Sequence, residues 1–467
     1  MEIKEGEVSQ EKRGYLIAKL TDRIHGFFEM EKAGTTIKIE ALAGFTTFMT
    51  MAYIIFVNPA ILSVSPPGGA GMDFDAVMAA TCIASAFATF LMASLANYPI
   101  ALAPGMGMNT LFSFGICGTM GVPWEKTLGI VFFAGLVFVV LTALRVREMV
   151  VDAIPEAIKL GTVGGIGFFI AFIGFKYAGI VKAHPATFIT LGNLKSPPTL
   201  LALGGVVLTA TLMARKIKGA IFWGILATGL AGLPLGLVKF HGILGPIPSL
   251  SATFGRLDVL GAMRVEYLAP IFVFLFFIMF DTIGTLVGVG QQAEMMIHGK
   301  LPRINRALFA DAAGATAGAV CGTSPVTCYI ESAAGVAAGG RTGLANVVTG
   351  LLFLAALLFS PLVRMLGEGW QIPGTNDYLY PVTAPALIVV GSLMVKNIIE
   401  IDWGDPSEAL PAFLTIIVMP LTFSIADGLA IGFIAYPLVK LLAGRGQEVH
   451  GLVYLLALLF ILRYAFL

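Results

Sequence analysis

The chain has 467 residues, of which 57% are hydrophobic and 12% charged, and its formal net charge is +1. Soluble domains are about 45–50% apolar and about 25% charged, so the composition indicates a polytopic membrane protein. No basic tract could neutralise nucleic-acid phosphates, no P-loop motif could bind ATP, and the five histidines and four cysteines show no metal-ligand spacing. We therefore expect no enzyme activity, metal or other cofactor.

The first 38 residues are predicted to form a cytoplasmic tail. Between Tyr15 and Phe28, apolar residues recur at helical spacing among charged ones, which is typical of an amphipathic helix on a membrane surface. About fourteen apolar segments follow as candidate membrane spans. They are 40–63, 76–97, 100–117, 126–145, 155–177, 199–215, 217–238, 267–290, 306–320, 322–338, 344–366, 381–399, 409–425 and 427–442. Residues 451–467 are apolar again and either span the membrane or lie at its interface, which leaves the side of the C-terminus open.

Two halves of the chain repeat one another. At one constant offset, the run GIVFFAGLVFVVL from Gly129 matches GLLFLAALLFSPL from Gly350, and Pro104 matches Pro325. Each half holds about seven segments, an odd number, so the second half enters the membrane from the opposite side. The sequence thus predicts an all-α protein of about 14 transmembrane segments in two inverted 7-segment repeats.

The first half carries two predicted helix breaks. Asn58–Pro59 lies within the first segment, and Asn58 there either breaks the helix or touches a ligand. In NYPIALAPGMGMN, residues 100–103 can be extended, and Pro104–Gly105 would start a half-helix that presents Asn109.

An acid lies near the middle of the eighth segment. In APIFVFLFFIMFDTIG, an uninterrupted apolar run precedes Asp281, and Thr285 follows one turn later on the same helical face. A charged residue at the bilayer centre costs about 2.5–3.5 kcal/mol and usually marks a functional site. The alternative is that Asp281 caps a neighbouring broken helix.

The second-half counterpart of the Pro104 region runs from Gly318 to Gly343, as GAVCGTSPVTCYIESAAGVAAGGRTG. Residues 319–321 can be extended, Gly322 breaks the segment, and Ser324–Pro325 is typical of a helix start. Glu331 would then lie within this half-helix, at about bilayer depth. Discontinuous helices with a nearby ionisable residue form the substrate sites of secondary transporters. The alternative is a packing helix rich in Gly and Ala, with one acid facing a cavity.

Two half-helices entering from opposite faces would bring their N-termini together, and the extended pieces before half-helices 3 and 10 would pair as two short antiparallel strands. Two acids, Asn109, hydroxyls such as that of Thr327, and free backbone amides suit a small, flat, neutral molecule. Two carboxylates would repel an inorganic anion. Tyr329 offers a stacking surface, although core packing explains an aromatic side chain equally well.

Basic residues follow the even-numbered segments, which predicts a cytoplasmic N-terminus in a multi-pass protein of the cell membrane. They are Arg145, Arg147, Lys159, Arg215, Lys216, Lys218, Lys300, Arg303, Arg306, Arg341, Lys440 and Arg445.

Four motifs carry a family resemblance: EALAGFTTFMTMAYIIFVNPAIL, APGMGMN, FDTIGTLVGVG and GTSPVTCYIESAAGVAAGGRTGLANVVTG. Over residues 39–446, the chain resembles the azaguanine-type hypoxanthine/adenine/guanine permease branch of the nucleobase–cation symporters, in the uracil/xanthine permease superfamily. The resemblance implies a uracil-permease-like fold with a core domain (39–150 and 266–370), a gate domain (151–240 and 371–467) and a loop between them (241–265). It also implies proton-coupled purine uptake by an elevator-like motion, with Asp281, Glu331 and Asn109 contacting the substrate.

An ion gradient must drive such uptake, since no nucleotide motif is present. Asp281 is the preferred proton carrier because its apolar neighbours Met279 and Phe280 disfavour its charged form, whereas helix-end amides favour the charged form of Glu331. The alternatives are a Na+ site built on Asp281 and a sulfate- or bicarbonate-type anion transporter of the same fold. The gate domain is also a possible homodimer surface.

Overall fold

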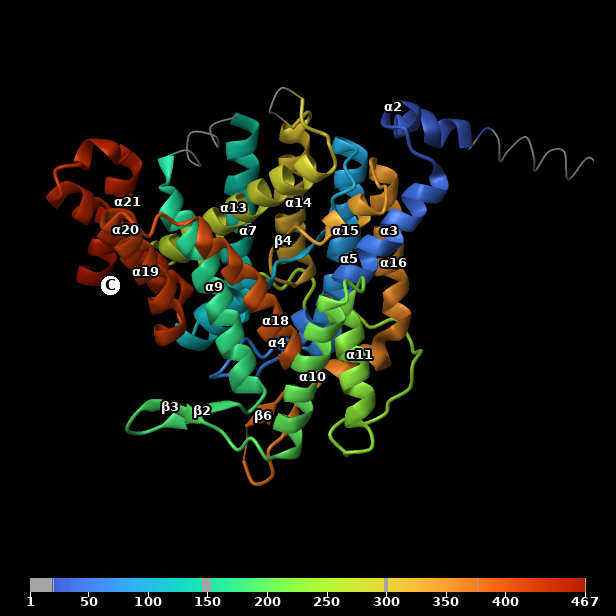
Figure 1. Ribbon diagram of the computed structural model, residues 1–467, viewed down its shortest axis with the longest axis horizontal. Helices are drawn as coiled ribbons and strands as arrows, with labels where there is room; N and C mark the ends of the chain where they lie inside the picture. The colour runs from blue at the N-terminus through green and yellow to red at the C-terminus, as the bar shows by residue number, and fades with distance from the viewer. Residues whose placement is uncertain (1–18, 20, 145–152, 298–300, 376, 467) are drawn as a thin grey trace, which may run out of the picture.

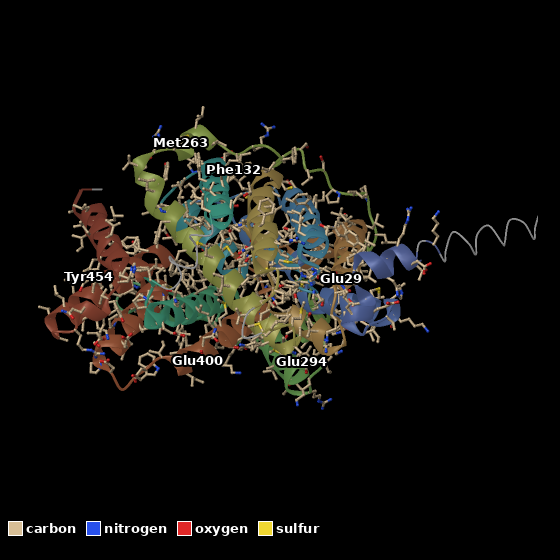
Figure 2. All side chains as sticks on the ribbon, turned by 90° about the horizontal axis from the view of Figure 1, so that it is seen from above. Glu29, Phe132, Met263, Glu294, Glu400 and Tyr454 are labelled. Carbon is tan, nitrogen blue, oxygen red and sulfur yellow. The ribbon has the colours of Figure 1, made fainter. Side chains whose placement is uncertain are left out.

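The computed structural model describes residues 19, 21–144, 153–297, 301–375 and 377–466. The protein is mostly helical, and the described helices α2 (Met30–Ala33) and α21 (Gly451–Phe466) lie toward opposite ends of its longest axis (Figure 1). Tyr454, near the C-terminus, and Glu29, near the N-terminus, lie toward opposite ends of that axis (Figure 2).

The first half consists of helices linked by short turns. They are α2 (Met30–Ala33), α3 (Ile37–Met51), α4 (Ile54–Leu62), α5 (Phe74–Leu91), η1 (Met92–Ala96), α6 (Met106–Thr110), η2 (Leu111–Thr119), α7 (Trp124–Leu144), α9 (Glu156–Tyr177), α10 (Pro197–Ala214) and α11 (Ala220–Gly232).

The second half is built in the same way. Its helices are α12 (Val259–Ala262), η3 (Val265–Tyr267), α13 (Leu268–Gln292), α14 (Ile304–Cys321), α15 (Ser332–Ala337), α16 (Gly343–Ala356), η4 (Leu357–Phe359), α17 (Ser360–Gly367), α18 (Ala384–Val395), η5 (Lys396–Glu400), α19 (Pro406–Thr422), α20 (Ile425–Leu442), η6 (Gly446–Glu448) and α21 (Gly451–Phe466).

Eight helical stretches within the described residues are long and apolar enough to cross a membrane, and the protein is therefore a multi-pass membrane protein. They are Ile37–Leu62, Phe74–Ala96, Trp124–Leu144, Glu156–Tyr177, Pro197–Ala214, Val265–Gln292, Gly343–Gly367 and Ile425–Leu442. Two shorter apolar helices (Ala220–Gly232 and Pro406–Thr422) and the two broken segments lie between them in the chain, and a third short apolar helix (Gly451–Leu462) follows the last.

Two short strands from distant parts of the chain pair inside the molecule. β1 (Leu102–Pro104) and β4 (Val326–Cys328) are antiparallel and fully buried, and β4 lies near the middle of the molecule (Figure 1). An antiparallel strand pair is thus present as predicted, but its second strand is Val326–Cys328 and not the expected residues 319–321. An extended segment in a membrane protein must satisfy its backbone groups within the protein, and these strands do so with each other. Two further strand pairs, β2 (Val181–His184) with β3 (Phe188–Leu191) and β5 (Trp370–Gln371) with β6 (Tyr378–Leu379), lie in connecting segments.

The helices pack as two neighbouring groups. In one, α14 packs on α5 and α7, and α16 packs on α3 and α5; in the other, α9 packs on α18, α19 and α20. The first group lies on the side of α3 and the second on the side of α21 (Figure 1). Glycines allow the close approach of α9 and α18, because a Cβ on Gly167 would lie 2.7 Å from the carbonyl oxygen of Gly391.

The predicted amphipathic helix is only partly described. Residues 21–27 are helical, Phe27 is exposed and Phe28 is buried. The amide of Asn97 donates a 2.8 Å hydrogen bond to the carbonyl of Phe28, so the end of this helix is attached to the helical body. Residues 1–18 and 20, with Arg145, Arg147 and Lys300 of the orientation argument, lie outside the described residues.

Candidate functional site

The antiparallel crossing of β1 and β4 positions the two half-helices. The N–H of Gly105 donates to the carbonyl of Pro325 and the N–H of Tyr329 to the carbonyl of Ala101, each at 3.0 Å. Gly105 is the N-cap of α6, and Glu331 is the N-cap of α15, and neither end has a side-chain cap. Two helix N-termini, with their partial positive charge, therefore begin close to the crossing.

Two predicted helix breaks need correction. Helix α14 continues through Cys321 and ends at Gly322, whose φ is +90°, so residues 319–321 are helical and not extended. Ser324 and Pro325 precede a strand, and the half-helix begins only at Ser332. The pairing of β4 with β1 holds the intervening residues extended, and this tertiary contact overrides the local Ser–Pro signal.

Asn58 does not break its helix, because α4 continues through Asn58–Pro59 to Leu62. The first segment is interrupted earlier, between Met51 and Ile54. The buried amide of Asn58 instead connects three segments. It donates to the hydroxyls of Thr81 and Thr323 at 2.8 Å, and its oxygen accepts from Ser324 at 3.2 Å.

Glu331 has a phenol partner from the first segment. The hydroxyl of Tyr53 donates to Oε1 of Glu331 at 2.6 Å, and the hydroxyl of Thr50 donates to the Glu331 main-chain carbonyl at 3.2 Å. Tyr53 is 1% exposed. The two chain halves thus meet at this carboxyl group, and Tyr53 fixes its orientation.

Asp281 lies midway along α13, as predicted, and is half-buried. The charges of Asp311 and Glu331 both act on its carboxyl group. Thr285 is buried one turn further along α13. Three carboxyl groups therefore share one region, where burial and mutual repulsion disfavour all three being charged together.

The third of these acids, Asp311 on α14, is absent from the sequence prediction. Its side chain is fully buried and accepts two hydrogen bonds, from the Thr282 hydroxyl at 2.6 Å and from the N–H of Cys328 at 2.8 Å. The sequence did contain one sign of its importance, because Asp311 is the only acid in the predicted apolar segment 306–320. Asp311 joins α13 and α14 to strand β4.

The remaining predicted residues are all buried near the crossing. The hydroxyl of Thr327 lies 3.0 Å from that of Thr282, which extends the Asp311 network to β4.

The phenol of Tyr329 donates to the carbonyl of Pro104 at 2.5 Å, so it links the two broken segments. Asn109 contacts its own helical turn, with Nδ2 3.8 Å from the Met106 sulfur and Oδ1 accepting from Thr110 at 3.4 Å.

A further buried acid has a structural role that sequence reasoning missed. Glu40 on α3 is fully buried and accepts from the N–H groups of Arg341, Thr342 and Ala345 at 2.9–3.3 Å. These N–H groups are at the start of α16, and a carboxylate there satisfies free donors and complements the helix dipole. Glu40 therefore fixes α3 to α16, away from the β1–β4 crossing.

This arrangement defines a class of protein. Half-helices that meet beside buried acids, within a bundle of membrane-crossing helices, are typical of secondary transporters. The model of the Permease family matches residues 38–431, and the chain belongs to that family.

Its close relatives place it in the azaguanine-type nucleobase permease branch. A putative permease of Methanocaldococcus jannaschii is 52% identical, with 95% of this chain and 98% of that protein aligned. The guanine/hypoxanthine permease PbuG of Bacillus subtilis is 45% identical over 94% of this chain and 99% of its own length. The adenine permease AdeP of Escherichia coli is 42% identical over 94% and 95%.

Solved structures support the fold. The transmembrane domain of the cyanobacterial bicarbonate transporter BicA aligns with a TM-score of 0.61 at 16% identity, covering 85% of this chain and 97% of that domain. SLC26A9 aligns with a TM-score of 0.59 at 12% identity, covering 91% of this chain and 69% of its own. At such identities the likeness concerns the fold alone.

Proposed function

We propose that the protein imports purine nucleobases (hypoxanthine, adenine or guanine) and couples their uptake to protons. The observation that carries this proposal is the Glu331 carboxyl at the start of α15, held by Tyr53 beside Asp281 and Asp311. A carboxylate accepts the N–H groups on a purine edge, and the N–H groups of a helix start can donate to the ring nitrogens. The names of PbuG and AdeP support a purine over other small molecules.

The same cluster argues against an inorganic anion as the substrate. BicA and SLC26A9 share the fold, but fold alone does not determine function. Three acids would repel bicarbonate or sulfate unless they were neutralised. PbuG and AdeP are 45% and 42% identical to this chain, against 16% and 12% for the two anion transporters.

Asp281 is the proposed proton carrier. It lies midway along an apolar helix and close to two other acids, so a proton on Asp281 removes repulsion within the cluster. The protonated carboxyl can donate to a purine acceptor, and substrate and proton would then bind cooperatively. The rival candidate is a Na+ ion held by Asp281 and backbone carbonyls.

The proposed transport motion is an elevator movement of one helix group against the other. The group of α3, α5, α7, α14 and α16 would be the core that carries the site, and the group of α9, α18, α19 and α20 the gate. Packing within each group supports this division. We further propose 14 segments in two inverted repeats, a cytoplasmic N-terminus and a homodimer formed through the gate. The antiparallel pairing of β1 with β4 supports the inversion.

Uptake into proteoliposomes tests the function. Radiolabelled hypoxanthine, adenine and guanine should accumulate against a gradient when the lumen is more alkaline than the outside, and labelled sulfate should not. Collapse of the proton gradient should abolish accumulation. Sulfate uptake without purine uptake would exclude the proposal. Purine uptake that needs external Na+ but no proton gradient would identify Na+, and not the proton, as the coupling ion.

Binding to Glu331→Gln tests the site separately. This substitution keeps the shape of the side chain and removes its charge, and a hydrogen bond to a charged group contributes about 1.5–3 kcal/mol. Purine affinity should therefore fall at least about tenfold. An unchanged affinity would mean that Glu331 does not contact the substrate.

A further inference from the structure

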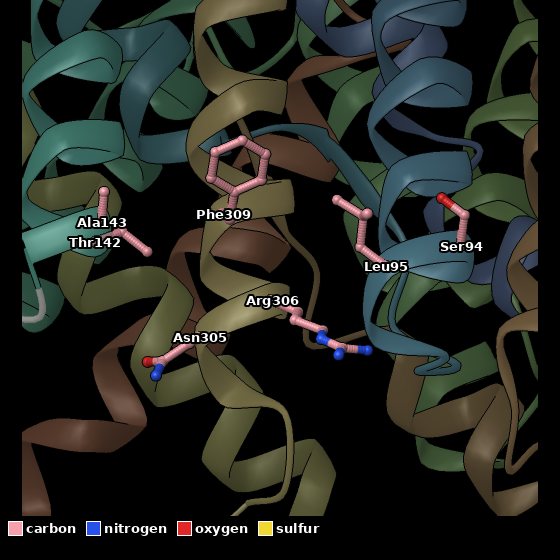
Figure 3. Close-up of a pocket in the computed structure, with 7 residues that line it drawn as sticks. All are labelled: Ser94, Leu95, Thr142, Ala143, Asn305, Arg306 and Phe309. Atoms are coloured by element: carbon pink, nitrogen blue, oxygen red, sulfur yellow. The ribbon is translucent and has the colours of Figure 1, made fainter.

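A groove separate from the carboxyl cluster opens between three helix ends. It has a volume of about 400 Å³ and is lined by η1, the last turns of α7 and the first turns of α14 (Figure 3). The lining residues are Ser94, Leu95, Thr142, Ala143, Asn305, Arg306 and Phe309. Two of these elements, η1 and the end of α7, each close an apolar stretch long enough to span a membrane, so the groove lies at the depth of lipid headgroups.

The polar side of this groove favours an anion. Among its lining residues, Arg306 carries the only formal charge, and its exposed guanidinium points into the space between α14 and the helix of Leu95 (Figure 3). The neighbouring Arg303 is engaged elsewhere, against the Tyr98 ring at 5.8 Å and with Glu29 at 4.0 Å. Helix α14 begins here with no side-chain cap and no acid in its first turn, so its N-terminal dipole adds to the positive potential.

A second, independent feature is the hydroxyl of Thr142. The residue is 5% exposed, and its Oγ1 is buried without a hydrogen-bond partner among the described residues. A buried hydroxyl without a partner destabilises the site that holds it. A ligand oxygen in the groove would satisfy it.

The other walls are apolar and face outward. Phe309 on α14 is 43% exposed, and beside the groove, outside its lining, Val140 and Leu144 on α7 are 48% and 65% exposed. On a membrane-spanning helix such surfaces contact acyl chains. A soluble phosphate would leave them uncovered, whereas a phospholipid would cover them while its headgroup filled the groove.

We propose that this groove binds an anionic phospholipid, with its phosphodiester on Arg306, the α14 N-terminus and Thr142, and its acyl chains along Phe309 and Leu144. A cation near the headgroups contributes about 1 kcal/mol to the binding of an anionic lipid. The site joins α7 to α14, so the bound lipid would hold α7 against the helix that carries Asp311.

Native mass spectrometry of the purified full-length chain tests the proposal, with equal amounts of phosphatidylglycerol and phosphatidylcholine as probes. The wild type should retain phosphatidylglycerol preferentially, and Arg306→Gln should weaken its binding about fivefold. Thr142→Val, which replaces the hydroxyl by a methyl group, should weaken it about two- to fivefold. Arg215→Gln is the matched control, because Arg215 is an exposed arginine at the end of α10, outside the groove.

Equal retention of the two lipids by the wild type, or the same affinity in Arg306→Gln as in Arg215→Gln, would overturn the proposal. Inorganic phosphate added alone distinguishes the two sources of a phosphate group. Its tight, Arg306-dependent binding without any preference between the lipids would identify a soluble-phosphate site and exclude the lipid. If Arg306→Gln fails to fold, Thr142→Val decides by the same comparison.

Discussion

The hydroxyl of Tyr53 lies 2.6 Å from Oε1 of Glu331 and donates a hydrogen bond to it, although the two residues are 278 positions apart in the chain. Tyr53 stands in the interruption between α3 and α4, and Glu331 stands at the start of α15. Each is thus at a break in its own segment, where backbone groups are not fully used by a helix. A substrate bound to Glu331 would share this carboxyl with the phenol.

Tyr53→Phe should weaken purine binding by about three- to tenfold, because Glu331 loses the donor that orients it and stabilises its charge. Isothermal titration or a scintillation proximity assay measures the change. Tyr98→Phe is a matched control, since Tyr98 is a fully buried tyrosine whose hydroxyl has no hydrogen-bond partner. In a Glu331→Gln background, Tyr53→Phe should have little further effect. Additive losses in the double variant would show that Tyr53 acts independently of Glu331.

Asp281→Asn should abolish concentrative, pH-dependent purine uptake while leaving exchange of purine across the membrane measurable, because an amide cannot carry a proton. Counterflow and pH-jump assays in proteoliposomes separate the two activities. Glu294→Gln, which changes an exposed acid just after α13, should behave like the wild type. Concentrative uptake that persists in Asp281→Asn would assign the proton to another acid.

Asp311→Ala should destabilise the protein more than Asp311→Asn. The alanine leaves the Thr282 hydroxyl and the N–H of Cys328 without their acceptor, and each buried unpaired donor costs about 1–3 kcal/mol. The asparagine retains one acceptor oxygen. The unfolding temperatures of the two variants in detergent measure this difference in stability. Equal stability of both variants and the wild type would mean that the hydrogen bonds of Asp311 do not stabilise the site.

Gly167→Val should disrupt the packing of α9 on α18. Its side chain would meet the Gly391 carbonyl at 2.7 Å and the Met394 Cβ at 2.9 Å, and such overpacking costs about 1–3 kcal/mol. Gly204→Val on α10 is the matched control, because nothing lies within 4 Å of its added Cβ. A lowered unfolding temperature in Gly167→Val alone is expected; equal values would indicate that α9 and α18 separate at little cost.

Arg445 connects the start of α19 with the segment after α20 and should stabilise the protein in a pH-dependent way. Its guanidinium bonds Asp405 at 2.6 Å and Glu448 at 2.7 Å. The hydrogen bond from Arg445 holds the pKa of Asp405 well below its usual range, and hydrogen bonds from Arg445 and Lys440 lower the pKa of Glu448 to about 2. Carboxyls with depressed pKa values stabilise the fold above their unfolded pKa, and this contribution is lost as the pH falls through the folded pKa.

The difference in unfolding temperature between the wild type and Arg445→Gln should therefore stay constant from about pH 7 to 5 and shrink between about pH 4 and 2. Lys396→Gln, the loss of an exposed lysine on η5, gives the background effect of removing one cation. A difference that instead grows on acidification would contradict the assigned pairing.

The sequence by itself determined the class of this protein, and the reason lies in short-range physics. An apolar run such as the one before Asp281 can only be stable in a membrane or a large core, and the sequence predicted the break at Gly322, where α14 ends. The need to satisfy backbone groups in lipid also predicted an antiparallel strand pair, although it placed the second strand at residues 319–321, which are helical. Residue identity over long motifs then placed the chain within its family.

Only the tertiary structure decided where the second strand lies and which groups surround the acids. Residues 326–328 are extended because β1, more than 200 residues earlier, supplies their partners, whereas the local Ser324–Pro325 signal favoured a helix. Asn58 stays inside α4 because Thr81, Thr323 and Ser324 occupy its side chain. The partners of Asp311 and Glu331 come from other segments in the same way. A hydrogen bond between residues so far apart does not change the local sequence pattern of either segment. It therefore cannot be predicted from that pattern and is found only in the packed structure.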